Sequence, residues 1–348
     1  MRALAIVLVL AACRGRDEVP VAHPAPAAPR ARFLKGQLHV HSDNSGDSTT
    51  PAAAVAHWYA QHGFDFLVYT DHNAITTYRS DELLTIPGVE LTRNLGDCDP
   101  PPETDMGCLM HVNALFVAAD RDQGVTLPAL DTTTRLGFYD ASLAVTRELG
   151  GIAQLNHPNM AWMMDAPMIT ALARRGAILM EVANQNEVES SAGDAQHPST
   201  EALWDRALTA GVTIYGVATD DAHHYDDAAA VRAAGDPAYV GDLGWVMVRA
   251  AKDPAAIRAA LGAGDFYAST GVALVDTRVA DGALVIAVAD TDTGPYTTTI
   301  IGTGGAVLAR SRELETRFAL ARAPRGYVRA VVVDRRGHKA WTQPVRVP

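Results

Sequence analysis

From residue 37 onward the chain alternates between short β-type runs and helix-like segments, and this alternation constrains its fold more than any other feature. The runs rich in β-branched and aromatic residues are 38–41, 64–70, 87–92, 110–117, 152–157, 178–184 and 212–219. Several segments between them carry a polar cap residue, a proline in the first turn and a terminal glycine, as helices do. Because strands alternate with helices, we expect a mainly parallel sheet or barrel.

The number of strands separates these two α/β architectures. Seven candidate strands exceed a typical half-Rossmann unit, and no GxGxxG motif follows the first one. The sequence therefore predicts a closed α/β barrel over residues 36–271. After about Val272 the helix signals stop, and alternating segments joined by glycine turns begin. This change predicts a small antiparallel β domain over residues 272–348.

The N-terminus has the pattern of an export signal. Residues 1–13 combine a basic start, an apolar run too short to span a bilayer, and LAAC, which resembles a bacterial lipobox. Cys13 would then be the lipid-modified first residue of the mature chain; the alternative is a plain secretory signal with a cysteine there by chance. Residues 14–35 are rich in proline and alanine and predict a tether. We expect an exported protein, lipid-anchored to a bacterial membrane and facing the periplasm or cell surface.

Charge and composition narrow the partners. The formal net charge of -11 argues against a nucleic-acid partner, because no basic face is available for phosphates. The chain has 12 histidines and 3 cysteines, so a metal site would have nitrogen and oxygen ligands and not thiolates. Cys98 and Cys108 bracket a long loop; in an oxidising compartment they could form a disulfide, or they remain two free thiols.

Metal-ligating side chains collect at the ends of the predicted strands. They are His39, His41, Asp71, His72, Glu90, His157, Asp221 and His223, with His111 at the start of another strand. A single histidine at a strand end is usually a structural residue, but a solvated face would carry scattered Lys, Glu and Ser. The carboxyl ends of barrel strands converge on one face, and the spacing of His39 and His41 points both rings to one side. The pattern predicts a metal site.

The same alternation separates ligands from their neighbours. Asp220 and His224 would face away from Asp221 and His223. The remaining histidines are predicted not to be ligands, because they lie on a helix or in polar surroundings: His57, His62, His197 and His338.

These residues carry a family resemblance. The segments His39-Val-His41, Thr70-Asp71-His72-Asn73, Pro87-Gly88-Val89-Glu90, His111, Asn156-His157-Pro158 and Asp221-Ala222-His223 resemble the ordered motifs of the PHP (polymerase and histidinol phosphatase) superfamily. GQLHVHSDNSGDS, GFDFLVYTDHN and GDFYASTG are similar to its carbaryl-hydrolase-like metallohydrolases. The resemblance covers roughly residues 36–271. It implies a distorted seven-stranded β/α barrel with two or three divalent metal ions.

The resemblance also implies which residues hold each metal. One ion would be held by His39, His41, Glu90 and Asp221, with Glu90 bridging to a second ion held by His111 and His157. Asp47, His72 and His223 would hold the third. Superfamily members often have Ser-Asp-Ala-His in the last motif, where this chain has Asp220-Asp221-Ala222-His223. Side-chain alternation favours Asp221 over Asp220 as the ligand.

The predicted function is that of a metal-dependent hydrolase. Nitrogen and oxygen ligands suit Zn, Mn or Fe, and a metal-bound hydroxide would attack an ester bond of a small-molecule substrate. Asp71 and His223 are the candidate catalytic residues. A phosphoester is the first choice of substrate, with thin support from Arg79 and Arg93 in nearby loops. The alternatives are a carbamate or carboxylic ester hydrolase, and a non-catalytic, metal-loaded periplasmic binding protein.

Overall fold

Two large sheets organise the chain. The computed structural model describes residues 32–186 and 188–348, so the predicted signal peptide with Cys13 and nearly all of the predicted tether lie outside the described residues. The first large sheet has ten strands, and its central part pairs β1 (Phe33–Gln37) with β2 in parallel and with β11 antiparallel. The second has five strands in the order β10-β9-β8-β6-β5.

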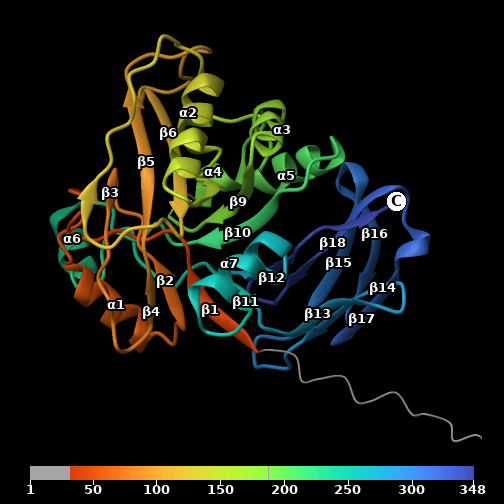
Figure 1. The fold of residues 1–348 in the computed structure, drawn as a ribbon. Coiled ribbons are helices and arrows are strands. Elements are labelled where there is room, and N and C mark those ends of the chain that lie inside the picture. The colour runs from red at the N-terminus through yellow and green to blue at the C-terminus, as the bar shows by residue number, and fades with distance from the viewer. Residues whose placement is uncertain (1–31, 187) are drawn as a thin grey trace, which may run out of the picture. The chain divides into compact units, whose positions relative to one another are not determined.

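The first sheet joins the start of the chain to its C-terminal strands (Figure 1). From one end to the other it contains β16 (Ala306–Ser311), β15 (Thr297–Gly302), β18 (Gly326–Val333), β19 (Lys339–Thr342), β12 (Phe266–Ser269), β11 (Trp245–Arg249), β1, β2 (Phe66–Val68) and β4 (Leu84–Ile86), with β20 (Val345–Val347) paired to β18. The pairing of β12 with β19 is antiparallel. Strands from residues 272–348 thus continue the same sheet that contains β1.

The second sheet is mixed. Its members are β10 (Tyr215–Thr219), β9 (Ala177–Asn184), β8 (Ile152–Leu155), β6 (Cys108–Leu115) and β5 (Gly88–Leu95). The first three are parallel, whereas β6 pairs antiparallel with both β8 and β5. Two smaller sheets consist of β13 (Leu274–Ala280), β14 (Ala283–Val288) and β17 (Glu315–Ala319), and of β3 (Ala74–Ile75) with β7 (Gln123–Gly124).

The predicted seven-stranded β/α barrel is wrong. Strand predominates over helix, and within the described part of the chain no sheet closes on itself: β4 and β16 end one large sheet, and β10 and β5 end the other. Antiparallel neighbours are the physical reason. β5 and β6 form a hairpin, and β11 and β12 pair antiparallel beside β1, so the regular parallel repeat that a β/α barrel needs is broken.

The helices cover the sheets, and several of them begin at a side-chain cap. They are α1 (Ala52–Gln61), α2 (Arg135–Glu148), α3 (Ala166–Arg174), α4 (Val188–Ala192), α5 (Thr200–Thr209), α6 (Ala228–Ala234) and α7 (Pro254–Ala263). The side chains of Thr134, Asp165, Ser199 and Asp253 accept a backbone N–H in the first turn of α2, α3, α5 and α7. No helix of the described residues is both long and apolar enough to cross a membrane.

Two apolar cores position the site. In one, α2, α3 and α5 pack against β6, β8 and β9, with fully buried Trp204 on α5. In the other, Leu34 and Phe66 of the first sheet pack with Leu179 and Val217 of the second. Isolated parallel bridges, Val40 to Ala222 and His72 to Glu90, then join the segments that leave the two sheets. The segment after β1 therefore meets the segment after β10, and the segment after β2 meets β5.

Candidate metal centre

Two histidines follow β1 because their neighbours are core residues. Leu38 and Val40 are fully buried in apolar clusters, and alternate positions of an extended segment point to opposite sides. His39 and His41 therefore share the other side, where both are also fully buried. The bridge from Val40 to Ala222 holds this segment beside the one that follows β10.

Two consecutive aspartates after β10 have different partners. The Asp220 carboxylate accepts hydrogen bonds from the backbone N–H groups of residues 242–244. Asp221 Oδ1 lies 3.1 Å from Nε2 of both His39 and His41. Asp221 also has a φ of +55°, a left-handed conformation that residues with a side chain rarely adopt and that clusters at functional sites. Asp221, and not Asp220, faces the histidines.

Glu90 is the carboxylate that most of the histidines share. In the β5–β6 register Glu90 lies opposite Asn113 and Thr92 opposite His111, so all four side chains emerge on one face of the hairpin. The carboxylate oxygens of Glu90 lie 3.4 Å from His39 Nε2, 3.5 Å from His41 Nε2, 2.8 Å from His72 Nδ1, 3.1 Å from His111 Nδ1 and 3.5 Å from His157 Nε2.

Asp47 forms the outer part of the cluster. Its Oδ2 lies 3.0 Å from His72 Nε2 and 3.3 Å from His223 Nε2. The His223 ring stacks on His41, with centroids 4.1 Å apart. The Asp47 side chain is 48% exposed, whereas Glu90 is buried, so the cluster extends from the interior to the surface.

These side chains form three overlapping groups whose ligand atoms lie within 4.8 Å of one another. The groups are His41, Asp47, His72 and His223; His39, Glu90 and His157; and His39, His41 and Asp221. His39 Nε2 is buried without a hydrogen bond, which costs about 1–3 kcal/mol for an unpaired group, and Glu90 Oε2 makes no hydrogen bond beyond its 2.8 Å contact with His72 Nδ1. A cation between them would satisfy both atoms, so the buried His, Glu and Asp residues fit a metal ion.

The grouping differs in part from the sets that the resemblance implies. His39, and not His111, lies with Glu90 and His157 in one group. His111 is at the edge of the cluster: its Nδ1 is 3.2 Å from His157 Nε2, and its Nε2 is 2.8 Å from Asn94 Oδ1. His157 has a φ of +23°, the second left-handed residue among the candidate ligands.

The structure brings one of the two candidate catalytic residues into the cluster. His223 is a member, but the Asp71 carboxylate accepts hydrogen bonds from the backbone and hydroxyl of Ser42 and from the Thr76 hydroxyl. Asp71 therefore holds the loop after His41 and does not bond the His72 ring. None of the metal-binding groups in the described residues includes the histidines predicted to be non-ligands, which are His57, His62, His197 and His338.

Burial and the carboxylates have opposite effects on the histidine pKa values. Burial alone would lower the pKa of His39, but Asp221, Glu90 and Glu181 outweigh it and hold the pKa well above its usual value. Glu90 and Asp47 likewise outweigh burial at His72 and raise its pKa to about 10. For His41, burial and the neighbouring histidines lower the pKa to about 3.

Glu181, a carboxylate beside the cluster, was not expected from the sequence. It lies in β9 and is fully buried, and its Oε1 is 2.7 Å from His39 Nδ1. The signal was a glutamate inside the apolar run ILMEVAN, because a buried acid in a strand interior needs partners. Asn113 and Asn156 were missed too; Asn156 donates to Glu90 Oε1 and to Asn113 Oδ1.

A cavity of about 200 Å³ opens onto the cluster. Its walls are formed by the candidate ligands other than His39 and His41, together with Asn94, Leu109, Met160 and Tyr239. Met160 begins a short 3₁₀ turn, η1 (Met160–Trp162), directly after the His157 segment. The cavity is therefore lined both by candidate ligands and by the apolar side chains of Leu109 and Met160.

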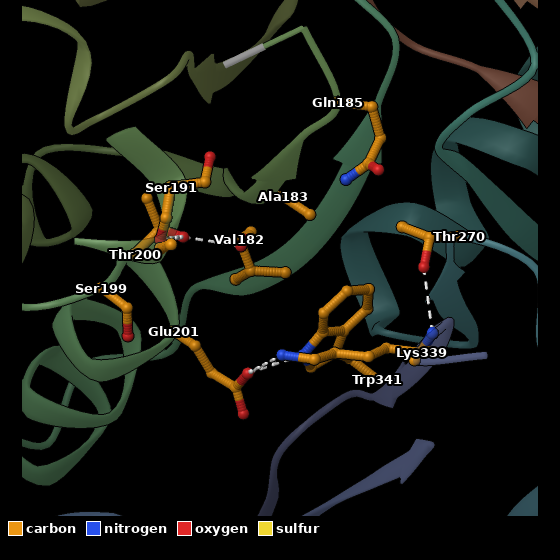
Figure 2. Close-up of a pocket in the computed structure, with 12 residues that line it drawn as sticks. Val182, Ala183, Gln185, Ser191, Ser199, Thr200, Glu201, Thr270, Lys339 and Trp341 are labelled. Atoms are coloured by element: carbon orange, nitrogen blue, oxygen red, sulfur yellow. Dashed lines mark hydrogen bonds and ion pairs between the residues drawn. The ribbon is translucent and has the colours of Figure 1, made fainter. Parts of the chain in front are cut away.

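A second cavity, of about 400 Å³, is lined by α5, β9 and β19 (Figure 2). Its one carboxylate, Glu201, accepts a hydrogen bond from Trp341 Nε1 at 3.0 Å and lies 3.6 Å from Lys339 Nζ. The residues that line it belong to none of the metal-binding groups of the described chain. The cluster that opens onto the smaller cavity is thus the candidate metal centre.

Comparison with known proteins does not assign a family. No family model matches this chain, and no curated protein matches it. The relation to the PHP superfamily stays a prediction from the ordered motifs.

Proposed function

We propose that this chain is a metal-dependent hydrolase of the carbaryl-hydrolase-like type within the PHP superfamily, acting on an ester bond of a small molecule. One observation carries the proposal. Three groups of His, Glu and Asp side chains, which extend from buried His39 and Glu90 to exposed Asp47, overlap in one cluster beside a cavity, and His39 Nε2 is buried without a hydrogen bond. Two or three divalent ions, Zn, Mn or Fe, fit the nitrogen and oxygen ligands.

The inner residues of the cluster would bind metal, and a residue at the cavity would transfer protons. Bound divalent ions supply Lewis acidity and an activated water. His39, His41, Glu90 and Asp221 form the buried part of the ligand set. His223, at the cavity and 3.3 Å from Asp47 through Nε2, is the candidate to move a proton to or from the substrate when two ions are bound and its Nε2 holds neither.

The charge of the loaded cluster supports a phosphoester. The ligand groups contain three carboxylates, Asp47, Glu90 and Asp221, with neutral imidazoles as the other ligands. Three divalent ions would carry more positive charge than these carboxylates and the neighbouring Glu181 carry negative charge, so a site loaded with three ions attracts an anionic ester. This attraction does not need an arginine.

The cavity wall favours a second candidate, a carbamate or carboxylic ester. Leu109, Met160 and Tyr239 line the cavity, and no Arg or Lys is among its lining residues in the described chain. Arg93, which had suggested a phosphate site, donates to the Pro128 carbonyl and lies over the Phe138 ring. A neutral ester with an apolar leaving group fits this wall.

The test is elemental analysis combined with a substrate screen. We expect the wild type to contain two or three divalent ions and His39→Ala to lose metal and turnover together. The matched control is His57→Ala on α1. The His57 ring contacts exposed Glu82, so this variant should change neither the metal content nor the turnover. Aryl phosphate, aryl phosphodiester and aryl carbamate substrates separate the two ester classes.

The other outcomes are informative as well. A wild type without metal would overturn the proposal. Metal that His39→Ala removes, with no turnover of any of these esters, would support the non-catalytic binding protein instead.

For location, we propose an exported protein anchored through lipidated Cys13. The disulfide between Cys98 and Cys108 supports export, because such bonds persist in oxidising compartments. Cys13→Ser should move the protein from the membrane fraction to the soluble fraction. Unchanged fractionation would contradict the anchor.

A further inference from the structure

Glu181 contacts the metal cluster without belonging to it. The side chain is fully buried in β9, and it is absent from every ligand group of the described chain. Its Oε1 lies 2.7 Å from His39 Nδ1 and accepts hydrogen bonds from the Thr219 hydroxyl at 2.7 Å and from Gln154 Nε2 at 3.3 Å. The carboxylate thus bonds residues of β8 and β10, the two strands beside its own.

The second oxygen of Glu181 bonds two more donors. Oε2 accepts the backbone N–H of His157 at 2.5 Å and the Asn184 side-chain amide at 3.1 Å. The same Asn184 amide donates to Asp221 Oδ2 at 3.1 Å. Through these bonds Glu181 reaches three candidate ligands: the ring of His39, the backbone of His157 and, by way of Asn184, the carboxylate of Asp221.

The chemistry of the partners fixes the direction of each bond. The His157 N–H, the Thr219 hydroxyl and the two amide groups donate to Glu181. Because every partner can donate, Glu181 acts as an acceptor only, which is the behaviour of an ionised carboxylate. His39 must then keep a proton on Nδ1, so a metal ion that displaces the second ring proton meets the lone pair of Nε2.

That lone pair points into the candidate metal centre. His39 Nε2 is the buried atom without a hydrogen bond, 3.1 Å from Asp221 and 3.4 Å from Glu90. Glu181 cannot serve as a ligand without giving up donors, because both its oxygens are already bonded. A carboxylate on the far nitrogen of a metal-binding histidine fixes the tautomer and orientation of the ring.

We propose that Glu181 is the positioning residue of the metal centre: it holds the His39 ring with Nε2 facing the ligand cluster and anchors the strained His157 backbone. Its effect on metal binding rests on the proposed function, whereas the hydrogen bond to His39 does not. Without the carboxylate, the His39 ring can rotate or change tautomer, and His157 loses the acceptor of its backbone N–H.

The test compares Glu181→Gln with Glu201→Gln. Both variants replace a glutamate by its isosteric amide. Glu201, however, lies on α5 away from the cluster and accepts hydrogen bonds from Arg329 and Trp341. We expect Glu181→Gln to weaken divalent-metal binding by about 10–100-fold, measured by Zn²⁺ competition against a chromophoric chelator. Glu201→Gln should bind Zn²⁺ as the wild type does, and circular dichroism should report folded protein for both.

A second readout needs no metal. In the metal-free protein, the hydrogen-bonded Nδ1–H of His39 should give a downfield, slowly exchanging proton resonance, assigned by its loss in His39→Ala. Glu181→Gln should lose this resonance, and Glu201→Gln should keep it. If Glu181→Gln keeps both the resonance and wild-type Zn²⁺ affinity, the proposal is overturned.

The two proposals can fail separately. A wild type that binds no metal but shows the resonance, with loss only in Glu181→Gln, would overturn the hydrolase proposal and support the positioning role.

Discussion

At the scale of single residues, the candidate ligands depend on neighbours that pack elsewhere. Buried Leu38 and Val40 direct His39 and His41 to the opposite side of the same segment. The bonds of Asp220 to loop backbone leave Asp221 as the acid that faces the histidines. This alternation was readable from the sequence, because it needs only the period of an extended chain. The partners of Glu181 were not readable from the sequence, because they come from separate segments of the chain.

The pKa of His72 leads to a prediction about metal binding. Glu90 and Asp47 lie 2.8 Å and 3.0 Å from its ring nitrogens and, against the effect of burial, raise its pKa to about 10. At about pH 8 the metal-free protein therefore holds a proton on His72 that a metal ion must displace. We expect proton release on Zn²⁺ binding, and an affinity that increases with pH up to about this pKa.

Calorimetry in buffers of different ionisation enthalpy measures this release. The apparent binding enthalpy should change with the buffer in the wild type and less in His72→Ala. An enthalpy that is the same in every buffer would contradict the assignment of a displaced proton.

At the scale of elements, the β5–β6 hairpin explains both a success and a failure of sequence reasoning. Its two strands were expected from the alternating pattern, and so were the positions of the candidate ligands Glu90 and His111 on them. Their antiparallel pairing was not, because a strand-like run carries no direction of its own. The connection between them is a loop closed by the Cys98–Cys108 disulfide where a barrel would have a helix.

This disulfide should stabilise the hairpin and with it the metal centre. The cysteines are separated by 10 residues, and closing a loop of that length stabilises the fold by about 2–3 kcal/mol. We expect the Cys98→Ser, Cys108→Ser variant to lose about this free energy of unfolding in urea. The wild type in reductant is the matched comparison and should lose the same amount. Equal stability of oxidised protein and variant would contradict the prediction.

The loop also contacts the apolar side of the cavity. The Arg135 guanidinium donates to the carbonyls of Pro101, within the disulfide loop, and of Trp162, in η1. Met160, at the start of η1, lines the cavity. The hairpin loop and the cavity wall are therefore joined through one buried cation.

At the scale of the whole described chain, more of the candidate site than of the fold could be predicted from the sequence. The ligands follow strands whose positions in the sequence are local facts, such as His157 after the run that forms β8. The barrel failed because closure depends on which strands become neighbours, and the pairs β1–β11 and β12–β19 join residues far apart in the chain. Val40 and Ala222 still meet, through an isolated bridge, without a closed sheet.

The continuous first sheet leads to a prediction about cooperativity. The described residues, 32–186 and 188–348, form one compact unit, and Arg329 on β18 joins its C-terminal strands to α5. The Arg329 side chain is fully buried, with Nη2 2.7 Å from Asp205 and 3.0 Å from Glu201. We therefore expect the candidate metal-binding region and the C-terminal strands to unfold in one transition. Tryptophan fluorescence and far-ultraviolet circular dichroism measure this transition.

Arg329→Met tests this directly, because it leaves Asp205 and Glu201 without their buried cation. Removing one member of a buried ion pair costs about 3–5 kcal/mol, so the midpoint of the single transition should fall for both probes together. The matched control is Arg317→Met on β17, whose partner Asp281 is 90% exposed and whose loss should cost little. Two separate unfolding transitions, with only one shifted by Arg329→Met, would contradict this prediction. The C-terminal strands would then fold as an independent domain, because the β12–β19 pairing would not transmit stability between the two parts.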